Sequence, residues 1–208
     1  MRVETRKLAD PADVALRLNE MALALEPLLE VRDVAFLAAS NATPFHASNA
    51  AGTYSYQDGT WALRDRHVNE QWKLDRSGGV EGIINEAKSL RVVFANVDVA
   101  CQDEQNPKPR SPKGAGAERI CQDNLFFGLD LPHYSTVPDG KIATYYLMMD
   151  SRGAVELSRP VVAGRTFCSF VERIYLSDGH DMERTLEALD DSDRLDEFNP
   201  LVVRKTKT

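Results

Sequence analysis

The sequence predicts an α+β fold in which helices pack on a mixed or mainly antiparallel β-sheet, and three observations favour it. An amphipathic helical pattern begins after Asp10-Pro11. The stretch 91–100 is rich in β-branched residues, which are typical of strands. Three further strand-like runs, at 142–149, 154–162 and 166–176, make the C-terminal half mainly β.

Length and composition favour one globular domain over residues 1–208. A chain of 208 residues exceeds the commonest domain size and falls short of two average domains. The hydrophobic fraction is 43% and the charged fraction is 27%. Both values are ordinary for a globular protein and exclude disordered and collagen-like classes. No stretch has the composition of a linker, so we expect no division of the chain.

Charge and cysteine usage indicate a cytoplasmic protein. The net charge of −7 would repel both DNA and anionic lipid, so nucleic-acid binding would need a local basic patch. Cys101, Cys121 and Cys168 are widely spaced and form no CxxC pair, which argues against a disulfide framework or a zinc site. The N-terminus lacks the apolar core of a signal peptide, and no apolar stretch is long enough to span a membrane.

Local patterns predict the elements of the N-terminal half. Asp10 is a capping residue before Pro11, and an apolar stripe from Val14 continues to Leu25, where Pro27 would end the helix. Alternating apolar residues on both sides of Asp58-Gly59 predict a β-hairpin with a type I′ turn.

Further along the chain, residues 71–74 suggest a short strand. Apolar side chains at helical spacing predict a central helix over residues 80–90, with Ile84 in the core. The Pro- and Gly-rich composition of 102–122 indicates a long loop, which in a compact domain is usually functional or mobile.

The C-terminal strands are expected to begin with a hairpin whose loop is 150–153. Pro160 suggests an edge or a bulge in its second strand. Cys168 lies in an alternating segment and is expected to be a small core side chain, with the strand aromatics on one buried face. A short helix is expected over Asp181–Leu189.

One catalytic hypothesis involves Asp75 with Glu86-Ala87-Lys88. This spacing resembles the metal-binding pattern of the PD-(D/E)xK nucleases, which would imply that Asp75 and Glu86 hold Mg²⁺ while Lys88 activates water. The geometry requires Glu86 and Lys88 on one face of a strand. On the helix predicted for residues 80–90, they would diverge by roughly 200°. Strand or helix at this segment therefore decides between nuclease and non-nuclease.

Two segments are candidates for anion binding. The first is the basic loop, which carries Lys108, Arg110, Lys113 and Arg119 beside glycines that let backbone N–H groups approach a ligand. The second is the turn formed by Arg76, Ser77, Gly78 and Gly79, where a Gly-Gly pair would enter a helix and expose unpaired N–H groups.

These patterns favour a non-catalytic binding or regulatory protein that engages a phosphate-bearing partner, such as nucleic acid, or a protein partner through the basic loop. Common cofactor and hydrolase signatures are absent from the sequence, so no cofactor is expected unless the nuclease alternative brings Mg²⁺. The third alternative is a protein-interaction or self-assembly module that uses exposed strand edges.

Overall fold

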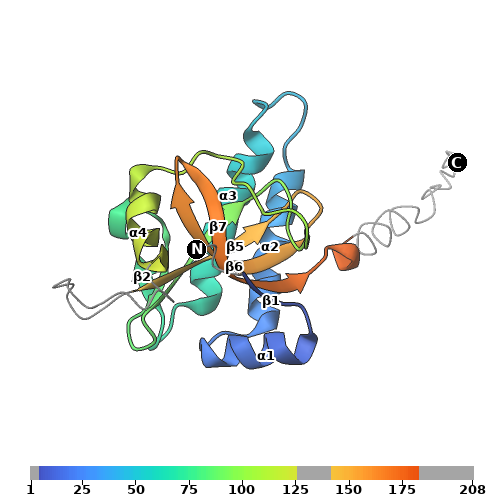
Figure 1. Ribbon diagram of the computed structural model, residues 1–208. Coiled ribbons are helices and arrows are strands. Elements are labelled where there is room, and N and C mark those ends of the chain that lie inside the picture. The colour runs from blue at the N-terminus through green and yellow to red at the C-terminus, as the bar shows by residue number, and fades with distance from the viewer. Residues whose placement is uncertain (1–4, 126–141, 183–208) are drawn as a thin grey trace, which may run out of the picture.

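The computed structural model describes residues 5–125 and 142–182 (Figure 1). Its strands are β1 (Arg6–Leu8), β2 (Lys73–Asp75), β3 (Gly82–Asn85), β4 (Leu90–Asn96), β5 (Ala143–Met149), β6 (Val155–Ala163) and β7 (Thr166–Ser177). They form one mixed sheet in the order β1-β7-β6-β5-β4-β3-β2. The pairs β4–β5 and β1–β7 are parallel and the other pairs are antiparallel.

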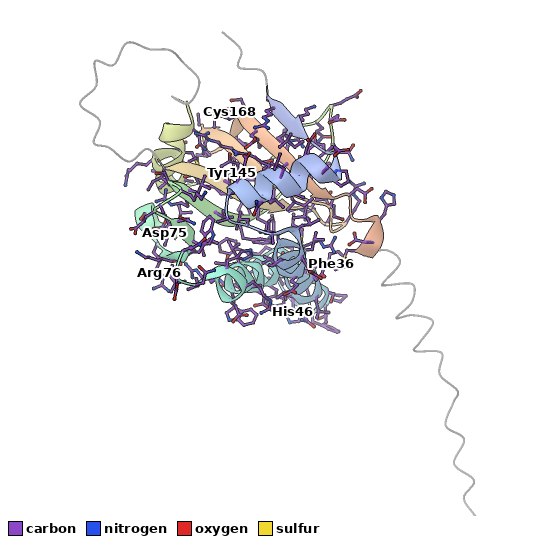
Figure 2. The ribbon with its side chains drawn as sticks, turned by 90° about the horizontal axis from the view of Figure 1, so that it is seen from below. Phe36, His46, Asp75, Arg76, Tyr145 and Cys168 are labelled. Carbon is purple, nitrogen blue, oxygen red and sulfur yellow. The ribbon has the colours of Figure 1, made fainter. Side chains whose placement is uncertain are left out.

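Helices cover both faces of the sheet. They are α1 (Pro11–Glu20), α2 (Leu25–Ser40), α3 (Ala50–His67) and α4 (Ala115–Leu125), with a 3₁₀ turn, η1 (Ser77–Gly79). Helices α1, α2 and α3 pack on one face, and α4 lies on the opposite face (Figures 1 and 2). The predicted α+β fold class is confirmed. No helix among the described residues is both long and apolar enough to cross a membrane.

Each sheet face has its own core because successive side chains of a strand point to opposite sides. Phe94 and Tyr145 pack among α1, α2 and α3, whereas Val93 and Tyr146 pack toward α4. The prediction that the strand aromatics share one face is therefore wrong for Tyr145 and Tyr146. Strands β4 and β5 lie in the middle of the sheet and are buried on both sides, which explains their nearly continuous apolar sequences.

The N-terminal helix begins as predicted but ends earlier. The Asp10 carboxylate accepts hydrogen bonds from the N–H groups of Ala12 and Asp13 and so caps α1. The helix ends at Glu20, and Ala22 has a φ of 57°. Pro27 lies in the first turn of α2, where backbone N–H groups have no acceptor within the helix, so the absence of an N–H in proline costs no hydrogen bond.

The predicted hairpin around Asp58-Gly59 is wrong, because residues 50–67 form α3. Gly59 lies within α3, where it allows the helix to pack closely on β4. A Cβ atom at Gly59 would lie 2.6 Å from Cε1 of Phe94, so only glycine lets α3 approach the sheet this closely. The tertiary contact accounts for a glycine that the local sequence assigns to a type I′ turn.

The predicted helix over residues 80–90 is also wrong. Strands β3 and β4 form a hairpin there, joined by a tight turn in which the Asn85 side chain accepts a hydrogen bond from the N–H of Lys88. Ile83 is fully buried, whereas Ile84 on the other face is only half-buried. Pairing with β2 on one side and β4 on the other overrides the helical spacing of the apolar residues.

The C-terminal hairpin is confirmed, although β5 and β6 are joined through residues 150–154, one residue more than predicted. The Asp150 carboxylate orders this turn by accepting hydrogen bonds from the N–H groups of Arg152 and Ala154. A register shift between Arg159 and Pro160 confirms the bulge, although β6 is an inner strand.

The expected core position of Cys168 is wrong. Cys168 lies near the start of β7 and is exposed (Figure 2). Phe167 and Phe170 are the residues of that segment whose side chains are buried. Residues 180–182 are helical at the start of the helix expected over Asp181–Leu189, and residues 183–189 lie outside the described part of the chain.

Candidate anion-binding site

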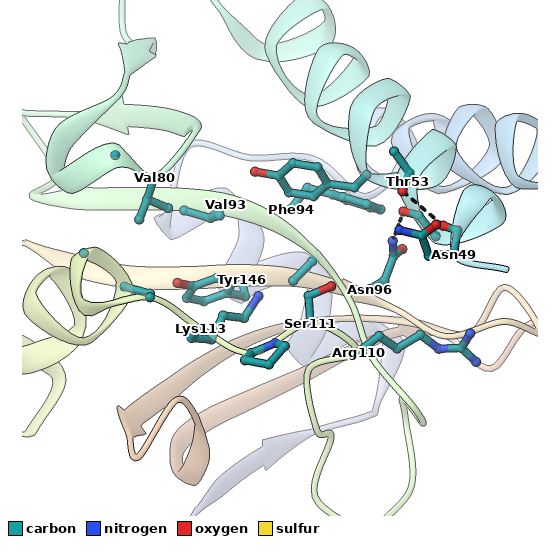
Figure 3. Close-up of a pocket in the computed structure, with 18 of the residues that line it drawn as sticks. Asn49, Thr53, Val80, Val93, Phe94, Asn96, Arg110, Ser111, Lys113 and Tyr146 are labelled. Atoms are coloured by element: carbon teal, nitrogen blue, oxygen red, sulfur yellow. Dashed lines mark hydrogen bonds between the residues drawn. The ribbon is translucent and has the colours of Figure 1, made fainter. Parts of the chain in front are cut away.

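A cleft of about 590 Å³ lies where the carboxyl-terminal half of β4 meets the starts of two helices (Figure 3). Its walls come from β4, the first turn of α3, the segment 110–114, the start of α4 and the residues around η1. Because β4 and β5 are parallel, their carboxyl ends lie at the same edge of the sheet. This is where ligands bind in sheets with parallel βαβ units.

The cleft unites parts of both segments proposed from the sequence. Arg110 and Lys113 of the basic loop line it, as do Gly78 and Gly79 of the glycine turn. The two segments are far apart in sequence, and the start of α4 packs on η1. The predicted loop 102–122 is therefore only partly a loop, since its last third forms α4.

The other predicted anion-binding residues lie outside the cleft. Lys108 is exposed, and its backbone N–H donates to Asp98. Arg119 is exposed on α4. Arg76 forms an ion pair with Glu81, and the Ser77 hydroxyl donates to the Asp75 carboxylate.

A backbone contact joins the two glycine segments. A Cβ atom at Gly116 would lie 1.8 Å from the carbonyl oxygen of Gly78, so a side chain at this position of α4 is excluded. Gly78 itself has a φ of 65°, in the left-handed region that favours glycine. The wall of the cleft thus depends on glycine at both positions.

Both helices present unpaired backbone N–H groups at the cleft. In α3 these belong to Ala51 and Gly52, and in α4 to Gly116 and Ala117, none of which has an acceptor within residues 5–125 and 142–182. The first N–H groups of any helix lack intrahelical partners and lie at the positive end of its dipole. Such groups are ready donors for an anion.

Lys113 supplies a half-buried cation. Its ammonium lies over the rings of Tyr146 and Phe167, 5.2 and 5.3 Å from their centroids. The backbone N–H of Lys113 donates to the carbonyl of Arg165 at 2.8 Å, which fixes the position of the residue. Burial lowers the pKa of Lys113 to about 8 because the charged form loses hydration.

Arg110 lies toward the other end of the cleft. Figure 3 shows its guanidinium directed away from Lys113, on the side where Asn49 and Thr53 begin α3. Its Nε donates to the Val97 carbonyl, and Arg110 forms no ion pair with any residue that the structure describes. It also borders a second hollow of about 280 Å³.

Asn96 is the polar centre of this edge, and its hydrogen bonds hold α3 against β4. Its amide donates to the Gly52 carbonyl and accepts from the Ser55 hydroxyl. No aspartate or glutamate lines the larger cleft among the described residues. The cleft therefore combines two cationic side chains and helix N–H groups with no opposing carboxylate.

The nuclease-like residues do not converge. Asp75 is buried in an ion pair with Arg91, whereas Glu86 pairs with Lys73 on the surface and Lys88 is exposed. Although residues 82–85 are a strand, Glu86 and Lys88 lie in the turn that follows it.

Their separation also argues against a shared ion. Asp75 pairs with Gly82, four residues before Glu86. A strand rises by about 3.3 Å per residue, so the backbone from Gly82 to the end of β3 at Asn85 already spans roughly 10 Å, and Glu86 lies beyond it. Within the described segments, no group of three potential metal ligands occurs.

Sequence reasoning missed three parts of the site, namely the start of α3, Asn96 and Tyr146. A signal for the first was present, because Asn49 precedes small residues in the manner of a helix cap. The competing hairpin interpretation of the following residues concealed it. Asn96 and Tyr146 carry no local signal, because their positions depend on the pairing of β4 with β5.

The glycine contact predicts a large effect of one methyl group. We expect Gly116→Ala to lower the free energy of unfolding by about 1–3 kcal/mol, because the rigid Gly78 carbonyl must move. Gly52→Ala is the matched control, since a Cβ atom there meets open space and alanine favours the helix by up to about 1 kcal/mol. Urea denaturation measures both variants, and equal stability would contradict the contact.

Comparison with protein-family models, curated proteins and solved structures gave no match to this chain.

Proposed function

We propose that this protein binds a small phosphate-bearing molecule in the cleft between α3 and α4. One observation carries the proposal: in a chain of net charge −7, the larger cleft has Arg110, Lys113 and unpaired helix N–H groups, and no carboxylate lines it in the described part of the chain. Such a concentration of donors favours an anion with several acceptor oxygens.

The size of the cleft favours a small molecule over duplex nucleic acid. Its volume of about 590 Å³ is typical of the sites that enclose small ligands. Duplex binding would instead favour a broad basic surface, whereas Lys108 and Arg119 lie outside the cleft. The apolar side chains of Val80 and Val93 give the organic part of a ligand a surface to contact.

Calorimetric titration with inorganic pyrophosphate and with ribose 5-phosphate tests the proposal. We expect the wild type to bind and the double variant Arg110→Ala/Lys113→Met to bind at least about tenfold more weakly, because each charge-assisted hydrogen bond contributes about 1.5–3 kcal/mol. Lys108→Ala/Arg119→Ala removes the same charge outside the cleft and should change affinity by less than about twofold. Equal losses in the two double variants would show that only net charge matters. Binding of single-stranded DNA or RNA, but of neither small probe, would favour a polymer ligand.

A dependence on pH should follow from Lys113. Its pKa of about 8 means that the ammonium becomes neutral as pH rises through that value, so anion affinity should fall between about pH 7 and about pH 9. The Cys121 thiol interacts electrostatically with Lys113, whose ammonium lies over the ring of Tyr146. Burial raises the pKa of the Cys121 thiol and of the Tyr146 hydroxyl, so both remain neutral over this range.

The variant Lys113→Arg retains its charge throughout this range and controls for titration of the ligand. The ratio of wild-type to Lys113→Arg affinity should decrease with pH. A constant ratio would show that the charge of Lys113 does not contribute.

A further inference from the structure

Lys113 differs from the other lysines that the structure describes. Lys7, Lys73, Lys88 and Lys108 are exposed, whereas the Lys113 side chain is half-buried in the cleft. No carboxylate forms an ion pair with Lys113 within the described residues. The pKa of about 8 leaves about half of the Lys113 side chains neutral at pH 8. A neutral amine is a nucleophile, and lysines desolvated in this way form Schiff bases.

The cleft separates this amine from the second cation. Lys113 lies beside Tyr146, whereas Arg110 extends toward the other end, near the start of α3 (Figure 3). An anion held by Arg110 and the N–H groups of Ala51 and Gly52 would leave the organic part of the ligand free to reach Lys113. The arrangement therefore suits a ligand with a phosphate at one end and an electrophilic carbon at the other.

We propose that Lys113 forms an imine with a phosphorylated aldehyde or ketone whose phosphate occupies the Arg110 end of the cleft. This inference rests on the proposed binding function and specifies its ligand class. The Lys113 nitrogen forms a bond to the carbonyl carbon as the C–O π bond breaks, and a proton moves from nitrogen to oxygen to give a carbinolamine. The hydroxyl then leaves as water, with a proton from solvent in the open cleft. The C=N bond forms as nitrogen loses its remaining proton.

Borohydride trapping with glycolaldehyde phosphate tests the inference. Reduction converts the imine to a stable secondary amine, and peptide mass spectrometry locates it. Under limiting reagent near pH 7.5 we expect Lys113 labelling to exceed that of any other lysine at least about tenfold, because its neutral fraction is more than a hundredfold above that of an ordinary lysine.

Two matched variants control for the amine. Lys113→Arg keeps the charge and should abolish the adduct, whereas Lys108→Arg should leave labelling of Lys113 unchanged. Glycolaldehyde, which lacks the phosphate, should label Lys113 at least about tenfold less, since it forgoes the contacts at the Arg110 end.

The outcomes separate the two proposals. Pyrophosphate binding by the wild type without selective trapping at Lys113 overturns the imine and leaves the binding function intact. Equal labelling by the two aldehydes overturns the assignment of a phosphorylated carbonyl ligand. Failure of both calorimetric binding and trapping overturns both proposals, whereas selective, phosphate-dependent trapping supports both.

Discussion

Replacing Glu156 with alanine is expected to lower the free energy of unfolding by about 3–5 kcal/mol, because it leaves a buried guanidinium without its counterion. Glu156 on β6 and Arg173 on β7 are both fully buried, and their side chains form two hydrogen bonds of 2.7 and 2.9 Å. Glu156 also accepts from the N–H of Cys101 and the hydroxyl of Ser158. Arg173 donates to the Gln102 carbonyl and so anchors the segment that leads to the cleft.

The exposed pair Lys73–Glu86 provides the control. Glu86→Ala removes the same type of side chain from a pair in which both partners are more than half exposed, and it should cost no more than about 1 kcal/mol. Urea unfolding monitored by tryptophan fluorescence measures both variants. A loss below about 1 kcal/mol for Glu156→Ala would show that the Arg173 charge is accommodated without its partner.

Ile83→Ala should cost about 2–5 kcal/mol, because it creates a cavity beneath β3 at a fully buried position. Its neighbour Ile84 points to the opposite face and is half-buried, so Ile84→Ala should cost clearly less. The two substitutions remove the same atoms from adjacent residues of one strand. The difference between their losses of unfolding free energy therefore shows whether successive side chains alternate between the two faces, as in a strand. Equal costs, or a larger cost at Ile84, would contradict the strand and revive the helix predicted from spacing.

The fold could be predicted where local signals agree with tertiary packing. Asp10 before Pro11 caps α1 in the structure, and the runs that form β4 to β7 have strong strand propensity. The prediction was wrong where one local signal had two physical causes. Glycine is common in turns, but at position 59 glycine is required because the ring of Phe94 occupies the space that a side chain would need. Apolar residues at helical spacing also fit a short strand when both neighbouring strands pair with it, as β3 shows.

The site was predicted in fragments. Composition alone singled out the basic loop and the Gly78-Gly79 turn, and both contribute to one cleft. The start of α4 determines which cations of the loop line that cleft. Because the sequence did not predict this start, it could not show that Arg110 and Lys113 line the cleft while Lys108 and Arg119 lie outside it. The contribution of Tyr146 likewise required the parallel register of β4 and β5.

The order of the strands also determines when the sheet can be completed during synthesis. Strand β1 lies near the N-terminus but pairs with β7, and the register joins Arg6 to Glu172. On the ribosome, β2, β3 and β4 can pair as soon as they emerge, because they are consecutive in sequence. β1 must wait until almost the whole described chain has been translated. The edge formed by β1 is thus the last part of the described sheet to form, because β7 is the strand with which β1 pairs.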